Sequence, residues 1–347
     1  MADPLLTVEN LTTVFDLPGR PVVAVDDVSF EIRTGETLGI VGESGSGKSV
    51  TAFSIINLLP YPGRVSAGRV LFLGRDLLTL PEPEMRKVRG AGIGLVFQEP
   101  TAALNPVMRV GAQIGEALTV HGLATRRDAR GRAIDLLRAV RIAAPDQCVD
   151  DYPHQLSGGM RQRVMMAIAL ACRPPLIIAD EPTTALDVTV QAQILDLLRG
   201  LAREFDVSLL LITHDLGVVA ETADRVAVMY AGRIVEDGPV RDVFARPLHP
   251  YTQGLLASIP GQTAGARLRA IEGVVPSLAA LPRGCTFAPR CPHRLAVCTT
   301  AVPAIVEIEQ GHSARCYLHS DRSVGRMRAG PASDETSSNP GAIHAAR

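Results

Sequence analysis

The chain alternates continuous apolar runs with amphipathic stretches. Leu176–Ala179 is wholly apolar and is closed by Asp180, and a similar run covers Leu209–Thr213. Runs of this length are typical of strands that a parallel sheet buries on both faces. After Asp187, apolar residues recur at helical spacing, namely Ile194, Leu195, Leu198 and Leu201. Strands that alternate with helices predict an α/β fold with a mostly parallel sheet.

Two segments depart from this pattern. Residues 5–33 alternate short β-rich runs with turn residues such as Pro18-Gly19, which predicts an antiparallel β edge. Residues from about 100 to 175 are expected to form a helical subdomain inserted in the α/β core. Its last helix is expected to begin at Ser157, because serine is a favoured N-cap residue.

After about residue 240 the periodic pattern weakens and prolines interrupt the chain. We therefore expect a core domain over residues 1–240 and a C-terminal extension over 241–320. Serine, glycine, alanine and proline dominate from 321 onward, a composition that predicts a disordered tail over 321–347.

Composition narrows the class of protein. The chain has 347 residues, of which 46% are hydrophobic, so it can bury a large core. Its 35 basic and 36 acidic residues give a net charge of −1, which argues against nucleic acid as the main partner. No stretch approaches the roughly 18 apolar residues of a membrane span, and no secretion signal is evident at the N-terminus. We expect a cytosolic chain that reaches a membrane only through partner proteins.

The strongest motif is Gly42–Ser49, Gly-Glu-Ser-Gly-Ser-Gly-Lys-Ser, directly after the apolar run Thr37–Val41. It matches the phosphate-loop pattern between a buried strand and a helix. Its glycines let successive N–H groups point at an anion, and the helix dipole adds positive potential. Lys48 can reach the β- and γ-phosphates, and the hydroxyl of Ser49 can bind Mg²⁺.

Two further motifs can act on a phosphate. Asp180 ends an apolar strand, a position suited to holding Mg²⁺, and Glu181 is placed to polarise an attacking water as general base. Ser157-Gly158-Gly159 opens a predicted helix and could bind an anion, although by itself the motif favours an ordinary capped helix start.

Taken together, these motifs resemble the ATP-binding subunit of an ABC transporter. The resemblance rests on the phosphate loop, Leu156–Gln162, Asp180-Glu181-Pro182, Gln98 after an apolar run, Ala185-Leu186-Asp187, and Thr213-His214-Asp215. It implies a head-to-tail dimer in which one subunit's Gly42–Ser49 and the other's Ser157–Gly159 hold each ATP.

The resemblance also implies individual roles. Glu181, His214 and Gln98 would be catalytic, and Ser49, Gln98 and Asp180 would surround Mg²⁺. Phe15 stands where the family stacks an aromatic ring on adenine, although it could equally face the core. The residues implied to contact ATP are Phe15, Gly42, Glu43, Ser44, Gly45, Ser46, Gly47, Lys48, Ser49, Val50, Ser157, Gly158 and Gly159.

Three later segments resemble one group in the family, the oligopeptide and dipeptide importers. They are Gln98–Met108, His249-Pro250-Tyr251-Thr252 and Leu281–Pro292. This likeness implies an ATPase that powers peptide import from the cytoplasmic face of the inner membrane. Its partners would be a second ATPase subunit (a copy of itself or a paralogue), two transmembrane permease subunits and an extracytoplasmic solute-binding protein. Related chains handle nickel or glutathione, so the solute stays open.

Four cysteines gather in the extension: Cys285, Cys291, Cys298 and Cys316. Their spacing lacks the C-x2-C pairs of zinc fingers, and four thiolates can hold Zn²⁺ or an iron–sulfur cluster. The resemblance favours a 4Fe–4S cluster, with four unligated packed cysteines as the alternative. A soluble ABC ATPase acting on nucleic acid is a rival function, disfavoured by the single cassette and the lack of basic surplus.

Overall fold

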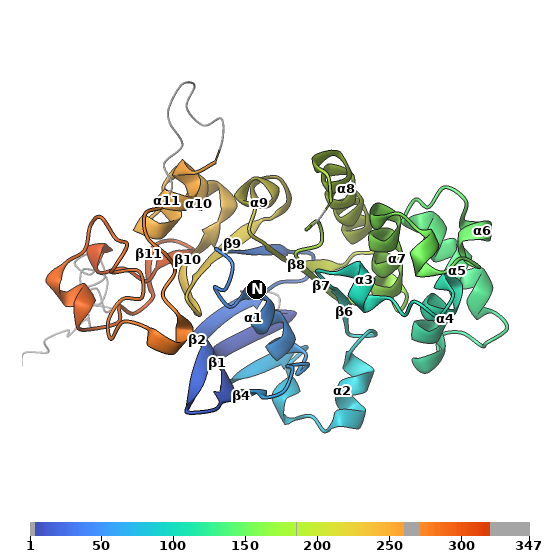
Figure 1. Cartoon of the computed structure of the whole chain (residues 1–347), viewed down its shortest axis with the longest axis horizontal. Helices are drawn as coiled ribbons and strands as arrows, with labels where there is room; N and C mark the ends of the chain where they lie inside the picture. The colour runs from blue at the N-terminus through green and yellow to red at the C-terminus, as the bar shows by residue number, and fades with distance from the viewer. Residues whose placement is uncertain (1–3, 185, 260–270, 320–347) are drawn as a thin grey trace, which may run out of the picture.

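The computed structural model describes residues 4–184, 186–259 and 271–319. The expected disordered tail, 321–347, lies outside the described residues. The molecule is elongated, with the α/β core in the middle, the helical subdomain at one end and the C-terminal extension at the other (Figure 1).

The main sheet has the strand order β11-β12-β10-β9-β3-β8-β7-β6. The five strands from β9 to β6 are parallel, as the apolar runs predict, and β10, β12 and β11 continue the sheet in antiparallel pairing. The strands are β3 (Thr37–Val41), β6 (Ile93–Val96), β7 (Leu176–Asp180), β8 (Ser208–Thr213), β9 (Arg225–Tyr230), β10 (Arg233–Pro239), β11 (Val306–Glu309) and β12 (His312–Ala314).

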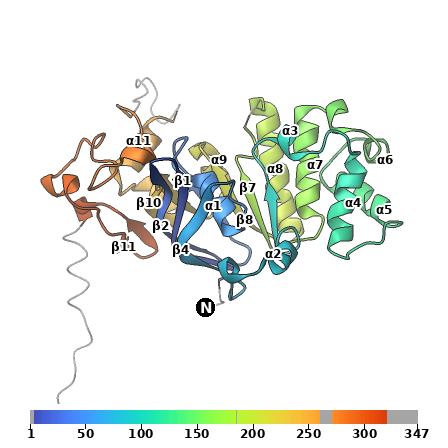
Figure 2. The ribbon, with the colours of Figure 1, turned by 60° about the horizontal axis from the view of Figure 1, so that its bottom comes forward.

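The expected antiparallel edge is a second sheet with the order β2-β1-β4-β5, and it is not joined to the edge of the main sheet. Its strands are β1 (Leu6–Leu17), β2 (Arg20–Ile32), β4 (Gly63–Phe72) and β5 (Arg75–Asp76). Helix α1 (Lys48–Ile55) contacts both β1 and β7, so it lies between the two sheets (Figure 2).

Alternate residues of the buried strands pack into two different hydrophobic cores. Leu176 and Ile178 of β7 pack with α1 and the antiparallel sheet, whereas Ile177 and Ala179 pack with the helices on the other face. This is the period-two alternation of a strand, with both of its faces apolar. The continuous apolar run is therefore explained by burial on both sides.

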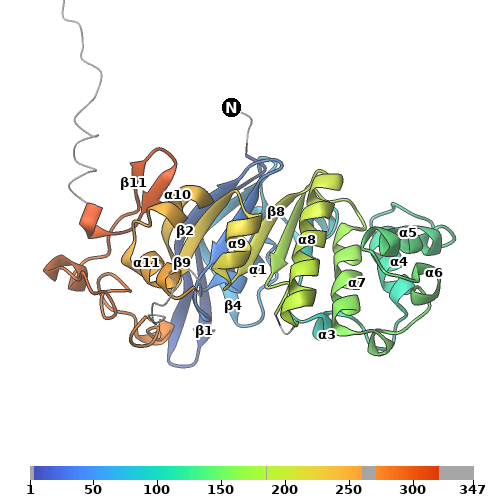
Figure 3. The same cartoon turned by 90° about the horizontal axis from the view of Figure 1, so that it is seen from above.

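The helical subdomain leaves the sheet after β6 and returns to it at β7. Seen from above, α9, α8 and α7 lie side by side, with α4, α5 and α6 beyond α7 (Figure 3). Helix α7 begins directly after Ser157, whose hydroxyl accepts the N–H of Met160 as the expected N-cap. The bounds are α2 (Glu82–Val88), α3 (Pro100–Ala103), α4 (Val110–Val120), α5 (Ala129–Ala139), α6 (Pro145–Cys148), α7 (Gly158–Leu170), α8 (Val188–Glu204) and α9 (Leu216–Thr222).

The extension is built onto the core. Strand β12 pairs with β10, and a shared cluster of apolar side chains joins Tyr230 of β9 to Tyr251 and Phe287 of the extension. Besides β11 and β12, the extension holds α10 (Val240–Ala245) and α11 (Pro250–Ala257). Short 3₁₀ turns in the chain cover Leu77–Thr79, Pro153–Gln155, Leu278–Ala280, Ala296–Thr299 and Tyr317–His319.

Across the described ranges, none of the helices combines the length and the apolar character that a membrane crossing requires.

A buried carboxylate organises the junction between core and extension. Glu236 of β10 is fully buried and accepts the backbone N–H groups of Leu248 and His249 and a bond from Nε2 of His312, each at 2.8 Å. His249 in turn accepts the N–H of Tyr251 at its Nδ1. The His-Pro-Tyr segment therefore serves as a structural anchor, since a buried carboxylate needs such partners to be tolerated.

We predict that this junction weakens in mild acid. Burial is the main reason that the pKa of His249 falls to about 4 from its ordinary 6.5. An unfolded chain binds a proton at this residue below about pH 6.5 and the folded chain does not, so the stability falls between about pH 6.5 and 4, by on the order of 3 kcal/mol. Thermal unfolding at pH 7 and pH 5 measures the loss.

The variant His249→Asn, which retains an acceptor for the N–H of Tyr251, should be less sensitive to this pH change. The exposed His154 gives the matched control, His154→Asn, which should keep the wild-type pH dependence. An unchanged pH dependence in His249→Asn would contradict the assignment.

Candidate nucleotide site

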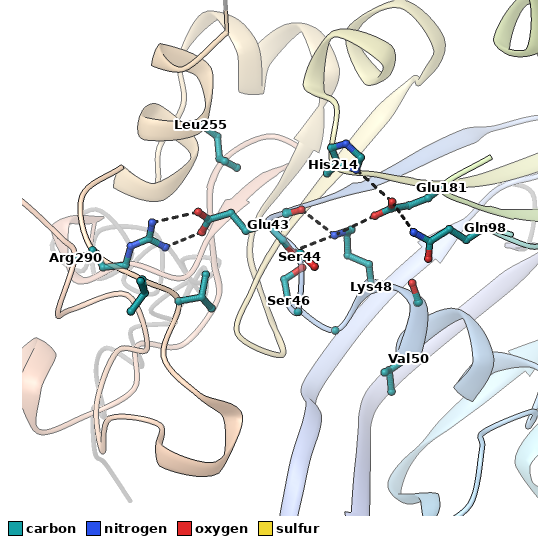
Figure 4. Close-up of a pocket in the computed structure, with 17 residues that line it drawn as sticks. Glu43, Ser44, Ser46, Lys48, Val50, Gln98, Glu181, His214, Leu255 and Arg290 are labelled. Atoms are coloured by element: carbon teal, nitrogen blue, oxygen red, sulfur yellow. Dashed lines mark hydrogen bonds and ion pairs between the residues drawn. The ribbon is translucent and has the colours of Figure 1, made fainter. Parts of the chain in front are cut away.

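The phosphate loop joins β3 to α1 and borders a cavity of about 860 Å³. Gly45 and Gly47 have φ angles of 77° and 102°, a left-handed conformation that only glycine adopts without strain. Figure 4 shows the side chains around the cavity. Its walls are Gly42, Glu43, Ser44, Gly45, Ser46, Gly47, Lys48, Ser49, Val50, Gln98, Glu181, His214, Leu255, Gly273, Val274, Val275 and Arg290.

Lys48 closes the loop on itself. Its Nζ donates to the carbonyl oxygens of Gly42 at 2.8 Å and Glu43 at 3.2 Å, and it lies 3.8 Å from Oε1 of Glu181. Burial lowers the pKa of Lys48, while the charges of Glu181 and Asp180 oppose this shift. A buried ammonium that is held by carbonyl and carboxylate oxygens can bind phosphate oxygens in their place.

Ser49 and Asp180 meet at the other side of the loop. The hydroxyl of Ser49 donates to Oδ1 of Asp180 at 2.9 Å, and burial is the main cause that raises the pKa of Asp180 to about 6. A buried carboxylate beside a hydroxyl is a donor set of the kind that Mg²⁺ prefers, and a cation would offset the cost of burying the carboxylate. The residues present therefore fit the expected ion.

Glu181 is the residue that several polar side chains of the site contact. Its carboxylate lies 2.8 Å from Oγ1 of Thr184, 3.2 Å from Nε2 of Gln98 and 3.3 Å from Nδ1 of His214. Its backbone has a φ of 44°, a left-handed conformation that is unusual for a side chain of this size and often marks a functional site. The sequence analysis did not predict Thr184 as a site residue. Its position three residues after Glu181 is the feature of the sequence that could have indicated it.

Two groups of expected nucleotide residues do not line this cavity. Ser157, Gly158 and Gly159 begin α7 and are absent from its walls. Phe15 is half-buried on β1 with its ring against Gly63, where an added Cβ would lie 2.8 Å from Cε1 of Phe15. The described chain therefore presents the phosphate side of a site without the expected glycine pair or aromatic ring.

The expected metal or iron–sulfur site at the four cysteines is not supported. In the part of the chain that the structure describes, no group of three or more histidine, cysteine, aspartate or glutamate side chains is arranged to hold a metal ion. The four thiols are free but near one another. Burial raises the pKa of Cys316 to about 11, and the charges of Cys285, Cys291 and Cys298 add to the shift. Of these thiols only Cys298 is buried, and the other three are partly exposed.

Known proteins identify the class to which this site belongs. The family described as "ABC transporter" matches residues 25–184, and "Oligopeptide/dipeptide transporter, C-terminal region" matches residues 235–298. Among solved structures, the dimeric cassette MJ0796 bound to ADP and Pi is similar, with a TM-score of 0.61 and 30% identity over 68% of this chain and 99% of that one.

Curated relatives are similar over almost the whole chain. The dipeptide transport ATP-binding protein DppD of Bacillus subtilis is 50% identical over 96% of this chain and 100% of its own length. The oligopeptide transport ATP-binding protein OppD of Escherichia coli is 50% identical over 91% and 94%. A probable peptide ABC transporter ATP-binding protein of Sinorhizobium fredii, y4tR, is 53% identical over 91% and 95%. The chain belongs to the ATP-binding subunits of oligopeptide and dipeptide ABC transporters, and it is an ATPase of that family.

We predict that Gly42→Ala abolishes tight MgATP binding. A Cβ at Gly42 would lie 2.1 Å from the carbonyl oxygen of Met229, so the loop or β9 must move. Gly35→Ala is the control: it adds a Cβ to a left-handed backbone (φ of 75°) in open space, which should cost about 1 kcal/mol of stability and leave binding unchanged. Titration with a fluorescent ATP analogue compares the two, and equal affinity in both variants would contradict the prediction.

Proposed function

We propose that this chain is the ATP-hydrolysing subunit that powers import of peptides through an ABC transporter. The observation that carries the proposal is the convergence of Lys48, Gln98 and His214 on the carboxylate of Glu181, beside the phosphate loop. DppD and OppD, which are similar to this chain over nearly their whole length, are named as dipeptide and oligopeptide transport proteins, and this supports peptides as the solute. Nickel or glutathione is the alternative solute.

In the proposed mechanism the chain positions ATP and supplies charge. Lys48 and the N–H groups of the loop hold the phosphates, and Mg²⁺ held by Ser49, Asp180 and Gln98 would neutralise phosphate charge. Glu181, whose carboxylate is oriented by hydrogen bonds from Gln98 and Thr184, accepts a proton from the attacking water. His214, whose side chain is 61% exposed, contacts the γ-phosphate and responds to its loss.

The nucleotide is proposed to lie between two subunits. Ser157, Gly158 and Gly159 stand outside their own chain's cavity, and a helix start with free N–H groups can bind an anion presented by another subunit. The similarity to a dimeric cassette supports a pair of subunits, and the head-to-tail arrangement is the one that the family resemblance implies. Phe15 would contact the adenine only if the base reached beyond the cavity walls described here.

The remaining assignments follow from this role. We propose that residues 1–240 form the nucleotide-binding domain and 241–320 the importer extension. The second ATPase subunit is a copy or a paralogue, and the other partners are two permease subunits and an extracytoplasmic solute-binding protein. The chain would then bind peripherally to the cytoplasmic face of the inner membrane.

Replacement of the general base tests the mechanism. Glu181→Gln should retain MgATP binding and lower steady-state phosphate release by at least a hundredfold, because the amide cannot accept the proton of water. It should also accumulate an ATP-bound dimer, which light scattering after size exclusion measures. Undiminished hydrolysis in this variant would remove Glu181 from its assigned role.

For the four cysteines, we propose that their thiolates bind a 4Fe–4S cluster, with Zn²⁺ as the alternative. Their mutual proximity supports this proposal. Full-length protein purified without oxygen should contain iron and sulfide in equal amounts, and Cys298→Ser should lose both. If the protein contains zinc and no iron, the four cysteines form a zinc site and the cluster proposal is wrong. If it contains neither metal, they are four unligated thiols.

A further inference from the structure

Glu43, the first variable residue of the phosphate loop, is bound to the C-terminal extension at two points. Its carboxylate forms a bidentate pair with Arg290, at 2.7 Å to Nη1 and 3.1 Å to Nη2. Its backbone N–H donates to the hydroxyl of Tyr251 at 2.9 Å. Its carbonyl oxygen accepts from Lys48, so three different groups hold this one residue.

Arg290 is a rigid partner for this contact. Only 4% of its side chain is exposed, and its remaining bonds run to the carbonyl oxygens of Ile271 and Glu272 and the hydroxyl of Tyr230. With the two bonds to Glu43, all five N–H donors of the guanidinium are used. A buried, fully bonded guanidinium keeps its geometry, because any movement would leave donors unpaired.

Tyr251 is equally fixed. Its side chain is fully buried against Tyr230 and Phe287, with ring centroids 4.6 and 5.4 Å away. Its own N–H is held by His249, which Glu236 anchors. The acceptor that receives the N–H of Glu43 is therefore set by the packing of the extension, and is independent of the loop.

These contacts lie on one side of the loop and the catalytic group lies on the other. Arg290 and Glu43 are on the side away from Glu181, Gln98 and His214 (Figure 4). Lys48 lies between them and bonds to the same Glu43 carbonyl. The extension thus acts on the part of the loop that shapes the phosphate cradle.

We propose that the C-terminal extension positions the phosphate loop for nucleotide, with Arg290 and Tyr251 as positioning residues that set the affinity for MgATP. The inference rests on the proposed function, because it assigns a role to residues behind the same nucleotide site. It makes the extension a part of the ATP site, so that a change in how the extension packs alters nucleotide affinity.

The test measures MgATP binding and the KM and kcat of ATP hydrolysis in the full-length chain. Arg290→Ala and Glu43→Gln should each raise the Kd and KM at least tenfold and leave kcat within about twofold, since neither residue reaches Glu181. The double variant should be no worse than Arg290→Ala alone, because both remove the same ion pair. Arg246→Ala is the matched control: it breaks an exposed pair with Glu309 in the same extension and should bind MgATP as the wild type does.

Two conservative variants keep the test valid if Arg290→Ala does not fold. Arg290→Lys retains the charge but loses the bidentate fork, and Tyr251→Phe retains the buried ring but loses the acceptor. Each should raise the Kd at least threefold with little change in the melting temperature. Wild-type affinity in both, or additive effects of Arg290→Ala and Glu43→Gln, would overturn the positioning role. Failure of the wild-type chain to bind MgATP would instead overturn the proposed function.

Discussion

The parallel pairing of β3, β8 and β7 is the constraint on which the rest of the site depends. Val41 of β3 pairs with Thr213 of β8, and Ile212 of β8 pairs with Asp180 of β7. In this register the carboxyl ends of all three strands reach the same edge of the sheet. The phosphate loop, Glu181 and His214 each follow one of these ends directly, so the main-chain hydrogen bonds of the sheet bring them together.

Burial then gives these polar groups their properties. Asp180 and Lys48 are nearly inaccessible to solvent, and their charges are tolerated because each faces an opposite charge or hydrogen-bonding groups. The left-handed backbone of Glu181 brings its carboxylate beside Lys48, at a cost in strain that the N–H bond from Glu181 to Ile212 helps to offset. A triphosphate would replace the contacts that Lys48 makes with the carbonyl oxygens of the loop and the carboxylate of Glu181.

The C-terminal extension contributes to both stability and the site. It continues the main sheet through β12 and shares the apolar cluster around Tyr230 with the core. Because that cluster also holds Tyr251 and lies against Arg290, the packing of the extension and the position of Glu43 are physically connected. A segment that follows the nucleotide-binding core in sequence is in this way a neighbour of its phosphate loop.

Local sequence determined much of this protein. Continuous apolar runs predicted the parallel strands, and helical spacing predicted the helical block. The phosphate loop and Asp180-Glu181 were recognisable because their chemistry is carried by adjacent residues. What only the tertiary structure decided is long-range: the antiparallel strands form a separate sheet, and Arg290 pairs with Glu43, 247 residues away. Such contacts depend on how the surfaces of distant elements pack together, and no local pattern of residues records that packing.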